Sequence, residues 1–257
     1  VVLGDVSGPA AVIEAASCIE RGIAKIMIAG ASGTRISAMR LNYHGDLPIP
    51  DVIDPLEYSS RPHDPTSKGV VGGEGAATLV LETAQHATQR RIKPIARIVS
   101  YASRFVPSQG MSRGIRSGDS KDLGARGSSA AIRLAIEVAL ADAAISADEI
   151  GLVVSHATGD PACDAAEREA IQLTVAEAPM VATIAALGHC GAASSMIDLL
   201  TGALALAKRI VPPTIYADSV RPVANFVTTP SDLNGKYVLC LSHTSEGNAT
   251  AIVLGNA

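Results

Sequence analysis

Two histidines in the second half of the chain each end an apolar run and precede residues that favour a helix start. His156 follows the run LVVS, and His189 follows ATIAALG. At the first junction Gly159 permits an unusual backbone angle and Pro161 stops the strand from continuing. A lone histidine of this kind is typical of a strand cap. Two of them at strand-to-helix junctions, where open α/β sheets bind ligands, predict a shared pocket with imidazole chemistry.

The elements that must position these histidines alternate between strands and helices. The repeated strings KIMIAG with EGAATLVL and KYVLCLS with EGNATAIVL indicate two related halves, unless two buried hairpins share small apolar residues by chance. We expect long loops over 31–69 and 105–127. Strands are expected at 25–29, 74–82, 95–101, 152–154, 180–184, 237–242 and 249–254, and helices at 7–22, 83–91, 128–143, from 164 onward and 194–209.

Composition narrows the class of protein. The 257 residues are 47% hydrophobic but only 3% aromatic, which favours tightly packed α/β layers. A net charge of -4 without a long basic run argues against a nucleic-acid partner. The longest apolar run, 199–207, is too short to span a bilayer, and the chain starts with no signal peptide. Four widely spaced cysteines in apolar surroundings are typical of a reducing cytoplasm.

Three stretches carry a family resemblance. Residues 150–171 read IGLVVSHATGDPACDAAEREAI, residues 60–82 read SRPHDPTSKGVVGGEGAATLVLE, and Gly188-His189 precedes PPTI at 212–215. In this order they resemble NAHGTGTPxGDxxE, RPFDxxxxGFVxGEGAGxLVLE and GH…PPTI of the β-ketoacyl synthases of fatty acid and polyketide synthesis. The resemblance covers nearly the whole chain. It implies a thiolase-like α/β fold with α-β-α-β-α layers, in which 1–91 is only the end of the N-terminal half and 92–257 is the complete C-terminal half.

The resemblance assigns site residues one by one. His156 and His189 fall on the two family histidines, which stabilise the thioester oxygen during decarboxylation. Asp5 falls at the position of the nucleophilic cysteine. A carboxylate at a helix start keeps the negative charge of a thiolate but not its nucleophilicity. The alternatives are that Asp5 is only a helix cap, or that the register is shifted so that Ser7 takes the position.

Other family positions also differ. The family lysine is Ile184 here, so Glu167, which matches its acidic partner, must find another donor or lie near water. Thr158 matches the first of two threonines that bind the pantetheine arm, and the second is Asp160. The C-terminal phenylalanine gate is shortened to HTSEGN at 243–248.

Three further observations concern thiols, metals and other histidines. Cys190 could replace the nucleophile, but the interpretation as a small apolar filler is preferred. Asp5, His156 and His189 have the residue types of a two-histidine, one-carboxylate metal set, but their spacing does not demand one, and no metal is expected. The remaining histidines in polar, loop-like surroundings are expected to be solvated: His44, His63 and His86.

These observations lead to a protein similar to β-ketoacyl synthases that binds acyl or malonyl thioesters on acyl carrier protein or coenzyme A. It would be degenerate for condensation but decarboxylate or hydrolyse a malonyl-type thioester through its two histidines. The alternative is a non-catalytic partner subunit similar to chain-length factors, and a third hypothesis is ordinary condensation with a misplaced nucleophile. No cofactor is expected beyond the phosphopantetheine that carries the substrate. The expected partners are acyl carrier protein and a second synthase subunit, in a homodimer or heterodimer, without nucleic acid or membrane, in the cytoplasm.

Overall fold

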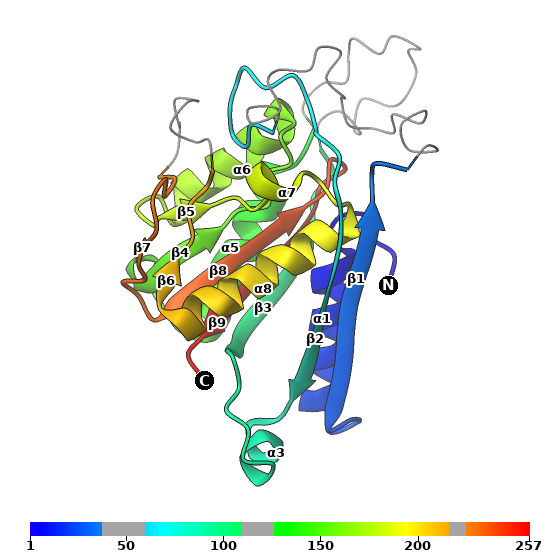
Figure 1. Cartoon of the computed structure of the whole chain (residues 1–257), viewed down its shortest axis with the longest axis vertical. Coiled ribbons are helices and arrows are strands. Elements are labelled where there is room, and N and C mark those ends of the chain that lie inside the picture. The colour runs from blue at the N-terminus through cyan, green and yellow to red at the C-terminus, as the bar shows by residue number, and fades with distance from the viewer. Residues whose placement is uncertain (38–59, 109–125, 216–224) are drawn as a thin grey trace.

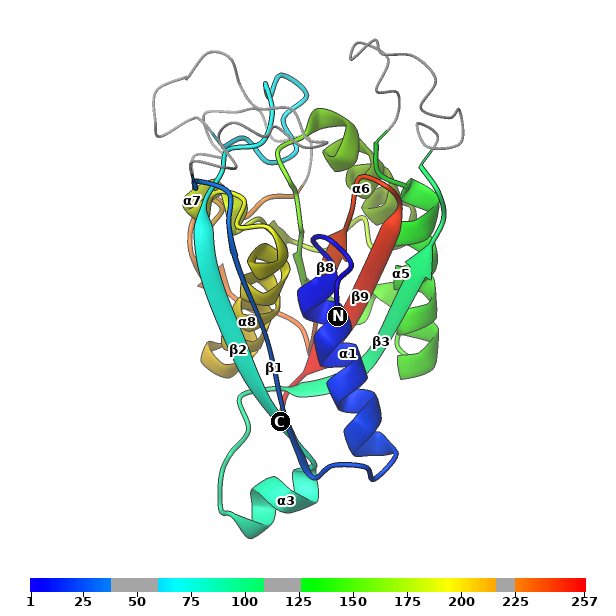
Figure 2. The same cartoon turned by 90° about the vertical axis from the view of Figure 1, so that its right-hand side faces the viewer.

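A computed structural model describes residues 1–37, 60–108, 126–215 and 225–257. Its elements form successive layers, which Figures 1 and 2 show from two sides. A two-stranded sheet lies on one side, helices α1 (Ser7–Glu20) and α8 (Ala192–Lys208) form the middle layer, and a five-stranded sheet follows. Helices α5 (Ser129–Ala143) and α6 (Pro161–Thr174) cover the far face.

The two-stranded sheet pairs β1 (Ile26–Thr34) with β2 (Glu74–Glu82) in antiparallel register. Helices α1 and α8 pack against this sheet and against each other. They approach closely at Gly8, where an added Cβ would lie 2.3 Å from Cγ of Met196. Their apolar faces fill the core between the two sheets, so the start of α1 and the start of α8 are held in fixed relation.

The five-stranded sheet has the order β3-β9-β8-β4-β5. Strand β4 lies parallel to both neighbours, and β9 lies antiparallel to both of its own. Because β4, β5 and β8 run in the same direction, their carboxyl ends meet at one edge. The bounds are β3 (Arg97–Phe105), β4 (Ile150–Val154), β5 (Met180–Val181), β8 (Tyr237–His243) and β9 (Asn248–Gly255).

Local sequence signals define the outer helices. Ser128 caps α5 by accepting a hydrogen bond from the Ala131 amide, and Asp160 caps α6 by accepting one from the Ala162 amide. Pro161 then occupies the first turn of α6, where its missing N–H costs nothing. The remaining short elements are α3 (Ala84–Gln89), a 3₁₀ turn (Ala147–Glu149), α7 (Ile184–Leu187), β6 (Ile210–Val211) and β7 (Ser231–Asp232).

Several expected boundaries were wrong. Strand β1 continues beyond residue 29 to Thr34, because its register with β2 extends to Glu74. Strand β5 ends at Val181 rather than 184, because Thr183 already has a helical backbone and precedes α7. Both pairs of repeated strings do form antiparallel strand pairs, β1 with β2 and β8 with β9. Within the described ranges, none of the helices has the length and apolarity needed to cross a membrane.

Candidate active site

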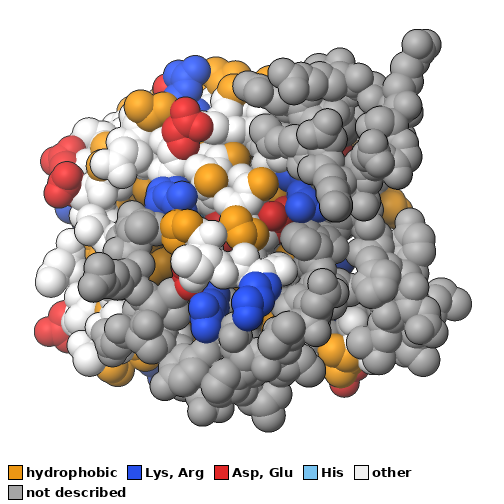
Figure 3. All heavy atoms as spheres, turned by 90° about the horizontal axis from the view of Figure 1, so that it is seen from above, with side chains coloured by type: hydrophobic (Ala, Val, Ile, Leu, Met, Phe, Trp, Pro, Cys, Tyr) orange, Lys and Arg blue, Asp and Glu red, His pale blue; other side chains and the backbone are white. Residues whose placement is uncertain are grey.

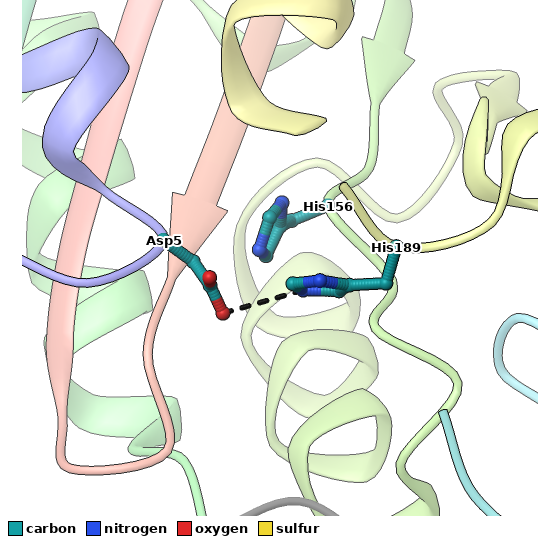
Figure 4. Close-up of side chains that lie close together, drawn as sticks. All are labelled: Asp5, His156 and His189. Carbon is teal, nitrogen blue, oxygen red and sulfur yellow. Dashed lines mark ion pairs between the residues drawn. The ribbon is translucent and has the colours of Figure 1, made fainter. Parts of the chain in front are cut away.

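Asp5, His156 and His189 converge in the interior (Figure 4). Asp5 lies in the loop before α1, His156 follows β4, and His189 lies in the loop before α8. The Asp5 Oδ2 atom is 3.3 Å from Nε2 of His189, and the two imidazole centroids are 5.8 Å apart. Both imidazoles are fully buried. The three side chains that the sequence assigned to one site therefore lie together.

The Asp5 carboxylate is an ion-pair partner and not a helix cap. Helix α1 has Val6 at its N-cap position and no side-chain capping bond. Instead, the Arg35 guanidinium donates to Asp5 Oδ1 at 3.2 Å while His189 contacts Oδ2. Burial opposes ionisation, but His189, His156 and Arg35 outweigh it and hold the pKa of the Asp5 carboxyl well below its usual range. Asp5 is thus a fixed negative charge at the tip of α1.

The backbone around His189 sets the position of its ring. Gly188 and Gly191 flank it with φ of 68° and 64°, a region that side chains disfavour. The His189 amide donates to the Val71 carbonyl at 2.7 Å, and the Gly73 amide donates to the His189 carbonyl at 3.0 Å. The glycine-rich string before β2 is needed here, because a Cβ on Gly73 would lie 2.2 Å from the Leu187 carbonyl oxygen.

The tautomer of His189 follows from its neighbours. The Gly191 amide donates to Nδ1 of His189 at 3.1 Å, so Nδ1 must carry a lone pair. The neutral ring then holds its proton on Nε2, which faces Asp5. Burial lowers the pKa of His189, and the nearby Arg35 and His156 act in the same direction against Asp5. His189 is therefore a neutral donor through Nε2.

The pKa of His156 is shifted in the direction opposite to that of His189. Its Nδ1 lies 3.4 Å from Oδ2 of Asp198, a buried residue of α8. Burial lowers the pKa of His156, but Asp198, Asp5 and Glu167 together raise it above its ordinary value. Nε2 of His156 is buried and has no hydrogen-bond partner among the described residues. A protonated His156 therefore presents a second donor that is free for a ligand.

The same geometry disfavours a metal. Ligand atoms of Asp5, His156 and His189 lie within 4.8 Å of one another, which is compatible with a metal set. A metal on Nε2 of His189 would require the proton to move to Nδ1. That proton would then face the Gly191 N–H, donor against donor. The residues fit a pair of hydrogen-bond donors better than a metal centre.

Glu167 contacts two histidines, where the family resemblance predicted a lysine. Ile184, at the lysine position, is buried among apolar side chains. Oε2 of Glu167 instead lies 3.5 Å from Nε2 of His63 and 3.3 Å from Nε2 of His243. The expectation of a solvated His63 was wrong, since the residue is 1% exposed. Its polar sequence neighbours concealed a buried contact with a segment about 100 residues away.

The two predicted pantetheine-binding residues are occupied with local contacts. The Thr158 hydroxyl donates to Asp164 at 3.2 Å and accepts from the Asp160 amide at 3.2 Å. Asp160 caps α6, and its Oδ2 lies 3.0 Å from Nε of Arg126. Their roles in binding a substrate remain predictions. The negative charge of Asp160 is balanced by the Arg126 guanidinium.

Cys190 is not activated. Its thiol contacts the carbonyls of Leu187 and Gly188, and burial raises its pKa. Because the thiolate is the reactive form, this supports its interpretation as a packing residue. Of the other two histidines, His86 is partly buried beside Glu82, and His44 lies outside the described residues.

Sequence reasoning missed four side chains of this site. Asp198 contacts His156, and Arg35 contacts Asp5. His63 and His243 both contact Glu167. A signal existed for Asp198, because an acid inside the apolar run of α8 requires a buried partner. Seen from above, the described surface carries Lys and Arg side chains among apolar and acidic ones (Figure 3).

Comparisons with known proteins identify the family of the chain. Residues 5–87 match the family description Beta-ketoacyl synthase, N-terminal domain, and residues 111–218 match its C-terminal domain. A Streptomyces cyaneus protein assigned as polyketide β-ketoacyl synthase 1 is 30% identical over 98% of this chain and 58% of that protein. The 3-oxoacyl-[acyl-carrier-protein] synthase 2 of Vibrio harveyi is 29% identical over 93% of this chain and 57% of that protein.

Solved structures show the same fold. A β-ketoacyl synthase from Burkholderia phymatum has a TM-score of 0.82 at 24% identity, covering 99% of this chain and 60% of that one. The ishigamide ketosynthase/chain length factor has a TM-score of 0.80 at 22% identity, covering 100% and 60%. The fold is thus the thiolase-like fold of ketosynthases. The chain belongs to the β-ketoacyl synthase family, and it spans less than two thirds of the length of the relatives it matches.

Proposed function

We propose that this protein binds malonyl or acyl thioesters carried on the phosphopantetheine of acyl carrier protein or coenzyme A, and decarboxylates malonyl thioesters without condensing them. The observation that carries the proposal is the pair of buried imidazoles beside an ionised carboxylate at the nucleophile position. The family matches and the fold support the thioester as the substrate class.

Condensation is disfavoured by the state of Asp5. Its carboxylate is paired with Arg35 and His189, and its lowered pKa keeps it ionised. Attack by such a carboxylate on a thioester would give a mixed anhydride, which water cleaves readily, so no durable acyl-enzyme would accumulate.

Decarboxylation needs only donors. The bond between the malonyl carboxylate and the α-carbon breaks, carbon dioxide leaves, and the electron pair forms an enolate on the thioester oxygen. Nε2–H of His189 and Nε2–H of protonated His156 would stabilise that oxyanion. A proton from water then adds to the α-carbon and gives the acetyl thioester.

The test is carbon dioxide release from malonyl-carrier protein or malonyl-coenzyme A. We expect release by the wild type and a loss of about 100-fold or more in His156→Ala or His189→Ala, as for removal of one oxyanion donor. His86→Ala serves as a matched histidine control outside the site. Release that persists in both site variants would overturn the proposal.

A second candidate function is a non-catalytic partner subunit that pairs with a cysteine-containing synthase. It is favoured by one observation: the Asp5 carboxylate lies 3.3 Å from Nε2 of His189, where its negative charge opposes an enolate on the same atom. No carbon dioxide release, together with co-purification with such a synthase, would support this second function over the first. In either case we place the protein in the cytoplasm as a homodimer or heterodimer; the cytoplasmic assignment is supported by four free cysteines.

A further inference from the structure

Glu167 holds the loop that carries His156. Its Oε1 accepts the His156 amide at 2.9 Å, and its Oε2 accepts the Ala157 amide at 2.9 Å. Ala157 has φ of 35°, a region that costs a non-glycine residue free energy. The Glu167 side chain is fully buried, so its charge is set by protein groups alone. The position of His156 therefore depends on what neutralises Glu167.

Two histidines from distant parts of the chain face that carboxylate. His63 lies in the loop before β2, and His243 ends β8. His63 Nε2 also bonds the Ser155 hydroxyl at 2.8 Å, next to His156. The His243 ring packs edge-on against the His156 ring with centroids 5.2 Å apart. Both partners of Glu167 thus touch the His156 segment directly.

The strained backbone of His63 is held by the same helix. His63 has φ of 59°, and its amide donates to Oδ2 of Asp164 at 2.8 Å. Asp164 and Glu167 lie three residues apart and share one face of α6. Two carboxylates of α6 therefore each bind the amide of a positive-φ residue: Asp164 binds that of His63, and Glu167 binds that of Ala157.

We propose that His63 and His243 are positioning residues of this site, which replace a lysine as the nitrogen partners of Glu167 and so hold His156 in place. This inference rests on the proposed function for its activity readout only. His63 stands where the RPFD string of the family has phenylalanine, and Ile184 stands at the lysine position. The nitrogen partners of Glu167 thus come from His63 and His243, and not from position 184.

The charge balance agrees with this arrangement. Burial raises the pKa of Glu167, but His243 and His63 outweigh it and bring it well below its usual value. Burial lowers the pKa of His63, but Glu167 and Asp164 outweigh it and raise it, against the opposing Arg168. Asp5, in the loop before α1, and Asp198, in α8, also raise the pKa of His156. Stability from charged His63 is fully present below its unfolded pKa of 6.5 and is lost as pH rises through the raised folded pKa.

The first experiment exchanges the cation. His63→Phe should lower carbon dioxide release about 10-fold or more through kcat, and adding Ile184→Lys should restore it. A lysine at position 184 would lie near Glu167, because Ile184 packs in one buried cluster with Ala157, whose amide binds Glu167. His86→Phe is the matched control and should leave the rate unchanged. A folded double variant without recovery would overturn the proposal.

The second experiment does not depend on activity. In His63→Gln, the loss of unfolding free energy relative to wild type should be largest below pH 6.5 and shrink as pH rises. The His156 amide resonance should shift in both His63→Gln and His243→Gln. A pH-independent stability difference with an unmoved His156 amide would overturn the proposal. If wild type releases no carbon dioxide, the proposed function fails, and this experiment still decides the positioning role.

Discussion

Replacing Asp5 with asparagine isolates the effect of its charge on the candidate chemistry. The side chain keeps nearly the same shape, while the carboxylate that pairs with His189 and Arg35 becomes neutral. In the resting site the Asp5 carboxylate lies 3.3 Å from Nε2 of His189, the atom that the enolate oxygen would need as a donor. We expect Asp5→Asn to speed decarboxylation of malonyl thioesters.

The size of the effect follows from charge separation. An oxyanion within hydrogen-bond reach of His189 Nε2 would lie about 4 Å from Asp5, where two like charges repel by about 4 kcal/mol at an effective dielectric constant of about 20. The Arg35 guanidinium, 3.2 Å from Asp5 Oδ1, cancels part of this repulsion. A remaining ~1.4–3 kcal/mol corresponds to roughly a 10- to 100-fold increase in rate.

The assay is carbon dioxide release from malonyl-coenzyme A under saturating and subsaturating conditions. Asp148→Asn, which changes a fully exposed carboxylate, should leave both rate constants unchanged. Arg35→Met, which removes the cation beside Asp5, should slow release. If Asp5→Asn slows release as strongly as His189→Ala does, Asp5 activates His189 rather than competing for it, and the reasoning is refuted.

Three further predictions concern the same residues. Asp5→Cys places a thiol before α1 beside His189, where it should be acylated by an acyl thioester and add one acyl mass over wild type by intact mass spectrometry; an unchanged mass in the folded variant would contradict this placement of the nucleophile position. The rate of decarboxylation should fall at high pH, as His156 loses its second proton through its raised pKa; a rate that already falls with rising pH below 6.5 would contradict it. Asp198→Asn removes the anion 3.4 Å from His156 and should lower kcat about 10-fold with a high-pH limb moved to lower pH, whereas an unchanged limb would exclude Asp198 as the cause of the raised His156 pKa.

The sequence predicted most of the strands and the meeting of His156 with His189. The parallel order of β4 and β8 brings their carboxyl ends to one edge, so strand-end residues converge whatever their separation in sequence. The sequence pattern alone did not reveal contacts between side chains that long loops bring together. His63 resembled a solvated loop residue, because its contacts with Ser155 and Glu167 lie about 100 residues away.

Asp198 and Arg35 were missed for a related reason. Their roles come from the packing of α8 and the end of β1 around the start of α1. Sequence periodicity places residues on a face of one element, but it does not say which acid and which base meet across three elements. The contacts of His63 and His243 with Glu167 likewise required coordinates.

Nitrogen-15 NMR of the protein labelled on its histidine side chains measures the central claim most directly. At neutral pH we predict that His189 is neutral with its proton on Nε2, and that His156 is protonated on both nitrogens. Assignment would come from the loss of each signal in His189→Ala and His156→Ala. A His189 ring with its proton on Nδ1, or a neutral His156, would contradict the arrangement of donors on which the proposed decarboxylation depends.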